Sequence, residues 1–108
     1  MNWLNQLLSP AQGNDTEDWN ADAVSVDVRS PAEFASGHVE GALNIPLDQF
    51  TQKYASALPE KAQQIVVYCQ SGGRSGQAAQ FLKQQQYTNI VNGINAPTVA
   101  RKTQRAIV

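Results

Sequence analysis

The stretch that decides the fold is "IVVYCQSGGRSGQAAQFL", residues 65–82. Its first part, "IVVYC", is continuously apolar, as buried parallel strands are, and from Ser75 onward the apolar residues recur at helical spacing. Gly72 and Gly73 lie between the two patterns and favour a tight turn. The stretch therefore predicts a strand, a short loop and a helix, with Cys69 at the end of the strand.

Three more short strands are predicted outward from this unit, and helical patterns separate them. The strand candidates are "AVSVDV" (23–28), "GALNIP" (41–46) and "TNIVN" (88–92); a helical face runs from Leu47 to Leu58, and "NGINAP" (92–97) reads as a turn. Alternating strands and helices predict an α/β fold with a parallel sheet covered on both faces. Ligands of such sheets bind outside the carboxyl ends of the strands, where Cys69 and Asp27 fall.

The segment "SPAEFASG" (30–37) carries both a helix start and a helix stop. Ser30 and Glu33 have the spacing of a capping box, and Pro31 suits the first helical position. Gly37 can take a backbone conformation that ends the helix. A short helix is expected directly after the first strand.

The length of 108 residues predicts one domain over 1–108. Residues 1–20 read as a short helix and a polar loop, and 98–108 as a basic terminal helix or tail. The N-terminal apolar stretch is too short and interrupted for a signal peptide or a membrane span. We therefore expect a soluble, cytoplasmic protein.

The charge and the cysteine count exclude several classes of function. A formal net charge of −1 favours neither a nucleic-acid groove nor a patch for acidic membranes. The single cysteine cannot form an internal disulfide, which fits a reducing compartment. One Cys and one His do not make a metal-ligand set, so we expect no metal and no cofactor.

Cys69 has the surroundings of a reactive thiol. It precedes a helix N-terminus, where unpaired N–H groups and the helix dipole favour negative charge. Gly72 and Gly73 let the loop turn its N–H groups inward, and Arg74 adds a permanent positive charge. Each feature stabilises a thiolate, and the same donors could hold an oxyanion or the outer sulfur of a persulfide. The alternative, that Cys69 is a small buried hydrophobe beside a turn, explains Arg74 less well.

The two segments "DVRSPAEFASGHVEGALNIPL" (27–47) and "IVVYCQSGGRSGQAAQFL" (65–82) resemble single-domain rhodaneses of the thiosulfate sulfurtransferase family. The resemblance covers about residues 22–95. It implies a central parallel sheet of about five strands, flanked by helices on both faces. It also implies an enzyme that moves sulfane sulfur from thiosulfate or a similar donor to cyanide or a thiol. A partner protein's thiol is a further possible acceptor.

The same resemblance assigns roles to individual residues. Cys69 would carry the sulfur as a persulfide, and Arg74 would hold the anionic donor. Asp27 and Arg29, of the family's "DVR" motif, would support the site structurally. The cradle for the substrate and the persulfide would comprise Gln70, Ser71, Gly72, Gly73, Arg74 and Ser75.

Other polar residues have structural interpretations that we prefer. The only histidine, His38, suggests a cysteine–histidine hydrolase, but "GHVEGA" resembles the family's turn before the second strand. Glu33 is interpreted as a helix cap rather than an acid catalyst. A terminal helix bearing Arg101, Lys102 and Arg105 could dock a partner, although a solvated face is the simpler interpretation.

Two other functional classes compete with sulfur transfer. Cysteine-dependent phosphatases and arsenate reductases resemble this loop, but they place five residues between Cys and Arg, whereas four lie between Cys69 and Arg74. The shorter loop favours a sulfur atom over a tetrahedral oxyanion. A non-catalytic rhodanese-like binding module would tend to lose the cysteine or the loop charge, and both are present. Because no second cysteine is available, a persulfide would need an external acceptor.

The segment "NGINAPTVARKTQRAIV" (92–108) departs from the family. Rhodanese-like domains typically follow their last strand with two glycines and a downstream Trp. Here Gly93 stands alone and no Trp follows it. The packing of this segment is therefore not predicted by the resemblance.

Overall fold

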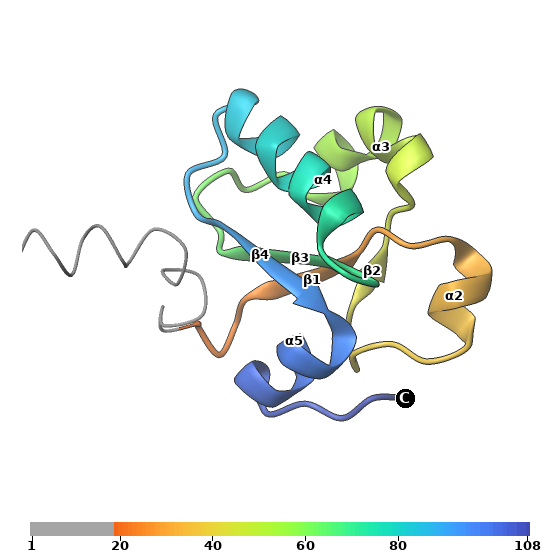
Figure 1. Cartoon of the computed structure of the whole chain (residues 1–108). Helices are drawn as coiled ribbons and strands as arrows, with labels where there is room; N and C mark the ends of the chain where they lie inside the picture. The colour runs from red at the N-terminus through yellow and green to blue at the C-terminus, as the bar shows by residue number, and fades with distance from the viewer. Residues whose placement is uncertain (1–18) are drawn as a thin grey trace, which may run out of the picture.

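The structure, a computed structural model, describes residues 19–108 (Figure 1). The helix expected within residues 1–20 falls almost entirely outside this range. Helices cover both faces of one central sheet. The elements in chain order are β1 (Val24–Asp27), α2 (Pro31–Ala35), β2 (Leu43–Asn44), the 3-10 turn η1 (Leu47–Gln49), α3 (Phe50–Ala57), β3 (Ile65–Cys69), α4 (Gly73–Gln84), β4 (Ile90–Asn95) and α5 (Ala96–Thr103).

The sheet has four parallel strands in the order β2-β1-β3-β4. Strand β3 pairs on both sides, and all of its residues are buried, as its continuous apolar sequence predicts. The prediction of about five strands is wrong for the described residues. Each of the four strands overlaps a run identified from the sequence, whereas the fifth is implied only by the resemblance. The rest of 19–108 forms helices, turns and one isolated β-bridge.

Successive residues of β3 point to opposite faces of the sheet and build two cores. Ile65, Val67 and Cys69 join the core formed with α3 and α4. Val66 and Tyr68 join the core formed with α5 on the other face. In Figure 1, α3 and α4 accordingly lie on one side of the sheet and α5 on the other. Cys69 therefore faces the layer to which α4 belongs.

Helix α2 begins where the sequence predicts, but its C-cap is Ser36 and not Gly37. The Ser30 hydroxyl accepts a hydrogen bond from Glu33 N at 3.2 Å, and the Glu33 carboxylate accepts one from Ser30 N at 3.0 Å. This reciprocal pair is the expected capping box. Gly37 follows the helix with φ +151°, a value that residues with a side chain rarely adopt.

The turn predicted for "NGINAP" is wrong, because β4 continues to Asn95 and α5 begins at the next residue. Val67 pairs with Asn92 and Tyr68 with Ile94, so Gly93 is the extra residue of a β-bulge. A bulge changes the direction of a strand and leaves the strand paired. The residues of "NGINAP" are typical of turns, so they did not indicate a bulge.

The C-terminal segment is also more ordered than a free tail. The predicted helix over 98–108 instead runs from Ala96 to Thr103. Beyond it, His38 and Val108 exchange two backbone hydrogen bonds, and Val39 forms an antiparallel bridge with Ile107. These bonds tie the last residues to the loop after α2. Among the described residues, no helix is long and apolar enough to cross a bilayer.

Gly93 gives a test of this packing. A Cβ there would lie 2.5 Å from a methyl carbon of Val99 and 2.8 Å from one of Val66, and both valines are fully buried. We expect Gly93→Ala to lower the free energy of unfolding by about 2–3 kcal/mol, measured by urea denaturation. Gly73→Ala is the control, because a Cβ at Gly73 meets nothing within 4 Å. It should leave stability unchanged or raise it by about 0.5 kcal/mol. Equal effects of the two substitutions would contradict the packing described.

Candidate active site

Cys69 is the last residue of β3, and three residues separate it from the first residue of α4. Its side chain belongs to the buried core, with 2% of the residue exposed. Gly72 makes the turn into α4 with φ +102°. This left-handed conformation favours glycine, and a Cβ would also lie 3.2 Å from Ile94 Cδ1. The loop geometry thus depends on Gly72.

The loop aims its hydrogen-bond donors at the sulfur. Gly72 N donates to Cys69 Sγ at 3.1 Å, and Ser75 N donates to it at 3.4 Å. The Ser75 hydroxyl also contacts Sγ at 3.4 Å. Three polar groups from the loop and the first turn of α4 therefore surround one sulfur atom, as expected of a site built to hold negative charge there.

These contacts change the acidity of the thiol. Burial raises the pKa of Cys69, but hydrogen bonds from the Ser75 hydroxyl and from the N–H groups of Ser75, Gly72 and Ser71 lower it further than burial raises it. The resulting pKa is about 7. A substantial fraction of the protein therefore carries a thiolate at neutral pH, and the thiolate is the nucleophilic form of cysteine.

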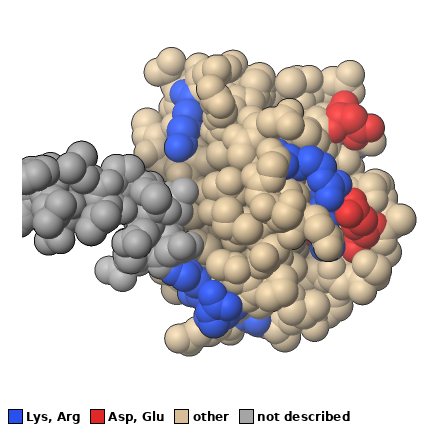
Figure 2. All heavy atoms as spheres, viewed as in Figure 1, with Lys and Arg blue, Asp and Glu red and all other residues tan. Residues whose placement is uncertain are grey.

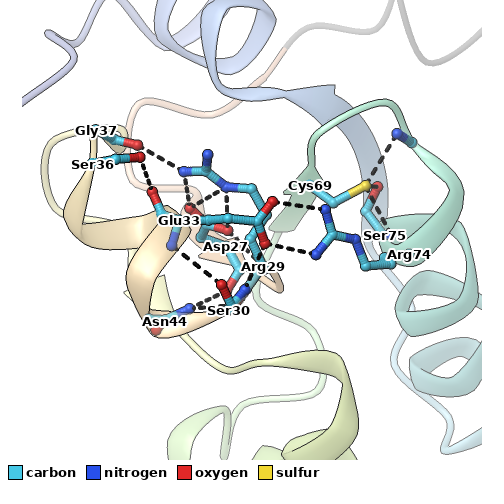
Figure 3. Close-up of polar contacts among 11 residues, drawn as sticks. Asp27, Arg29, Ser30, Glu33, Ser36, Gly37, Asn44, Cys69, Arg74 and Ser75 are labelled. Atoms are coloured by element: carbon cyan, nitrogen blue, oxygen red, sulfur yellow. Dashed lines mark hydrogen bonds and ion pairs between the residues drawn. The ribbon is translucent and has the colours of Figure 1, made fainter.

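Arg74 is held by Glu33 and not by the sulfur (Figure 3). Its two terminal nitrogens donate to the two Glu33 oxygens at 2.8 and 3.1 Å. This bond to Arg74, followed by the bond from Ser30 N, lowers the pKa of Glu33 to about 2. Glu33 thus both caps α2 and binds the arginine of the sulfur loop. The sequence predicted only the first role, because the second depends on a contact between distant segments.

Asp27 and Arg29 form a buried ion pair beside the loop (Figure 3). Arg29 Nε donates to both carboxylate oxygens at 3.0 Å, and Nη2 donates to Asp27 Oδ2 and to Gly37 O. The bond to Asp27 raises the pKa of Arg29 against the effect of burial. The pair fixes the chain between β1 and α2, which is consistent with the structural role expected for it.

Cys69 is one of the residues that line a recess of about 360 Å³. The recess lies between the loop and the N-terminus of α5. Gln70 contributes to its wall, whereas Ser71 on the loop and Gly73 at the start of α4 are exposed. The lining residues are Arg29, Cys69, Gln70, Asn95, Ala96 and Pro97.

His38 does not join Cys69. Its Nδ1 lies 2.8 Å from Phe34 O, and its ring stacks on the Phe34 ring with centroids 3.6 Å apart. Within residues 19–108, the hydrogen bonds to Cys69 Sγ come from the sulfur loop and the first turn of α4. These contacts favour the structural interpretation of His38 over a cysteine–histidine dyad.

The basic residues of the C-terminal segment make contacts within the chain. Arg105 donates to the carbonyl groups of Glu40 and Ala21, and Lys102 lies over the Trp19 ring at 5.5 Å. On the face shown in Figure 2, Lys and Arg side chains form separate patches and not one continuous basic surface. Arg105 lies beyond the end of α5 and not on a terminal helix, and the solvated face preferred from the sequence stays a prediction.

Asn92 is a residue near the site that the sequence did not single out. Its side chain accepts a hydrogen bond from the Ser75 hydroxyl at 2.7 Å and donates one to Gly72 O at 3.2 Å. The sequence patterns place Asn92 at the end of the predicted strand 88–92 and at the start of the predicted turn 92–97, and neither assignment gives its side chain a role. Its place beside the sulfur loop follows from the pairing of β4 with β3.

A family model described as a rhodanese-like domain matches residues 11–95. The chain belongs to the rhodanese-like family. A solved structure described as a rhodanese with anions from E. coli aligns with a TM-score of 0.68 and 37% identity, over 72% of this chain and 92% of that one. The rhodanese-like fold is therefore established by both the sequence and the arrangement of the elements.

Curated relatives of this rhodanese-like protein include sulfurtransferases. Thiosulfate sulfurtransferase PspE of Escherichia coli K12 is 42% identical over 67 residues, which are 62% of this chain and 64% of PspE. A sulfurtransferase of Allochromatium vinosum is 41% identical over 78 residues, 72% of this chain and 67% of that protein. The chain thus spans slightly less than two thirds of PspE.

The pKa of Cys69 gives a direct prediction. The rate of alkylation by iodoacetamide should rise with pH and reach half its maximum near pH 7, because only the thiolate reacts. The protein has a single cysteine, so the signal is unambiguous. A midpoint near the ordinary cysteine value of about 8.5 would show that the loop does not stabilise the thiolate.

Proposed function

We propose that this protein is a sulfurtransferase that moves sulfane sulfur from thiosulfate or a similar small donor to a thiol or cyanide through a persulfide on Cys69. The observation that carries the proposal is the convergence of Gly72 N, Ser75 N and the Ser75 hydroxyl on one sulfur. The names of the relatives and the recess beside Cys69 support it further.

In the first half-reaction, the Cys69 thiolate attacks the outer sulfur of thiosulfate. A new S–S bond forms, the S–S bond of the donor breaks, and sulfite leaves with the bonding electrons. Cys69 then carries a terminal sulfur with a negative charge. Gly72 N and Ser75 N donate to Sγ, the atom to which this terminal sulfur is bonded. The loop is therefore suited to stabilise the negative charge.

In the second half-reaction, a nucleophile attacks the outer sulfur of the persulfide. With cyanide, the carbon bonds to that sulfur, the S–S bond breaks, and Cys69 regains its thiolate as thiocyanate leaves. A thiol acceptor would become a persulfide in the same way. Because the chain has one cysteine, the acceptor must come from outside it.

Arg74 bears on how an anionic donor would bind. Its guanidinium is already paired with the Glu33 carboxylate, and both side chains are about one third exposed. A dianionic donor could share the exposed side of the guanidinium without breaking the pair, because an arginine has five N–H donors. We therefore propose that Arg74 attracts the donor while Glu33 fixes where the guanidinium lies.

A phosphatase remains the strongest competing function. Four residues lie between Cys69 and Arg74, and Gly72 N, Ser75 N and the Ser75 hydroxyl all converge on Sγ. A tetrahedral phosphate needs a wider ring of donors together with the arginine, whereas here Arg74 turns away to Glu33. The geometry favours sulfur, and Cys69-dependent turnover of an aryl phosphate would reverse that preference.

The experiment measures thiocyanate formed from thiosulfate and cyanide. We expect steady turnover by the wild-type protein and a loss of at least about 10³-fold in Cys69→Ser, because a serine hydroxyl is not ionised near neutral pH and cannot form a persulfide. Full activity in Cys69→Ser would overturn the mechanism.

Variants of Arg74 serve as the second arm of this experiment. Arg74→Gln should raise KM for thiosulfate by about tenfold or more, the effect of losing a charge-assisted hydrogen bond. Glu33→Gln replaces the charged partner of Arg74 with a neutral one and leaves Arg74 itself unchanged. It therefore separates the positioning of the guanidinium from its charge. If neither substitution changed KM, Arg74 would have no part in donor binding.

A further inference from the structure

The Asn92 side chain lies between the sulfur loop and the bulge of β4. Its Oδ1 accepts from the Ser75 hydroxyl at 2.7 Å and from Ile94 N at 3.1 Å. Its Nδ2 donates to Gly72 O at 3.2 Å. One amide thus contacts the loop, the first turn of α4 and the bulge, and its acceptor is aimed at the hydroxyl that touches Cys69.

The Ser75 hydroxyl has one proton and two acceptors in reach. Asn92 Oδ1 lies at 2.7 Å and Cys69 Sγ at 3.4 Å. Ser75 is completely buried, so its hydroxyl is out of contact with bulk solvent. The shorter contact places the proton on the side of Asn92, and the hydroxyl oxygen can then accept from the thiol of Cys69. When the thiol ionises, the same hydroxyl must turn to the sulfur to stabilise it.

We propose that Asn92 is a positioning residue that competes with the Cys69 thiolate for the Ser75 hydroxyl proton and so sets the fraction of Cys69 that is ionised. The inference deepens the proposed function, since the thiolate is the form that would attack a sulfur donor. The inference concerns only the ionisation of Cys69, however, so it can be tested without a sulfur donor.

The charged side chains around Cys69 form neutral pairs, which leaves uncharged groups to set the ionised fraction of its thiol. On the β1 side, Arg29 is paired with Asp27, and on the α4 side Arg74 is paired with Glu33. Each pair is neutral as a whole. On the α5 side, the recess at Cys69 is lined by Asn95, Ala96 and Pro97, which carry no charge. Asn92 itself borders a second, outer recess, which residues of α4 that include Lys83 also line.

Removing the Asn92 amide need not dismantle the loop. Gly72 O also accepts a hydrogen bond from Gly76 N at 2.8 Å, within the first turn of α4. The position of Gly72, and with it the donor Gly72 N, therefore has support that is independent of Asn92. A substitution at Asn92 then acts mainly on the Ser75 hydroxyl.

The test uses two substitutions that we expect to act in opposite directions on the pH midpoint of Cys69 alkylation. Asn92→Asp places a carboxylate that binds the Ser75 proton more tightly and adds negative charge, so the midpoint should rise by about one pH unit or more. Asn92→Ala removes the competing acceptor and leaves the hydroxyl to the sulfur, so the midpoint should fall by about half a unit. A general loosening of the loop would raise the midpoint in both variants.

Two controls make the assignment specific. Gln80 is exposed and borders the same outer recess as Asn92, so Gln80→Glu adds a charge there without a contact to Ser75. It should move the midpoint by less than about 0.2 units, because exposed charges are screened. In a Ser75→Ala background, the effect of Asn92→Ala should disappear, since no hydroxyl proton is left to compete for.

Thermal unfolding of each variant shows whether it is folded. If Asn92→Asp does not fold, Asn92→Ala and its combination with Ser75→Ala decide the question alone. Midpoints that move in the same direction, or an Asn92→Ala effect that persists without the Ser75 hydroxyl, would overturn the inference. Failure of the proposed function would look different: the midpoints would shift as described while no variant formed thiocyanate.

Discussion

The hydrogen bonds from Gly72 N and Ser75 N to Cys69 Sγ are the contacts around which the rest of the site is arranged. They require a chain that leaves a buried central strand, turns through a positive φ at Gly72 and enters a helix at once. The central strand places the sulfur, the glycine turns the donors inward, and the helix holds them there. Burial alone would make this thiol a weaker acid, so its lowered pKa comes from the hydrogen bonds of the loop and α4.

Two ion pairs surround this loop without neutralising the sulfur. Asp27 holds Arg29 in the buried layer, and Glu33 holds Arg74 at the surface. Asp27 is the last residue of β1, and Glu33 lies in α2, which it also caps. The first segment of the rhodanese-like motif therefore supports the second one, because Glu33 orients the arginine of the sulfur loop.

Local patterns predicted much of this structure, and contacts between distant segments account for what they missed. The apolar run of β3, the α2 capping box and the turn at Gly72 each depend on neighbouring residues, and each was identified. The bulge at Gly93 depends on Val66 and Val99 packing against it, and the second role of Glu33 depends on Arg74. Asn92 was missed for the same reason. The strand count was wrong because it came from the resemblance and not from a pattern in the chain.

The intact mass of the protein after exposure to thiosulfate is the most direct test of the account. After the donor is removed, the account predicts a gain of one sulfur atom, located on Cys69 and lost when cyanide is added. A mass that does not change, in protein whose Cys69 is still alkylated near pH 7, would contradict it, because the thiolate would then be present and would not accept sulfur.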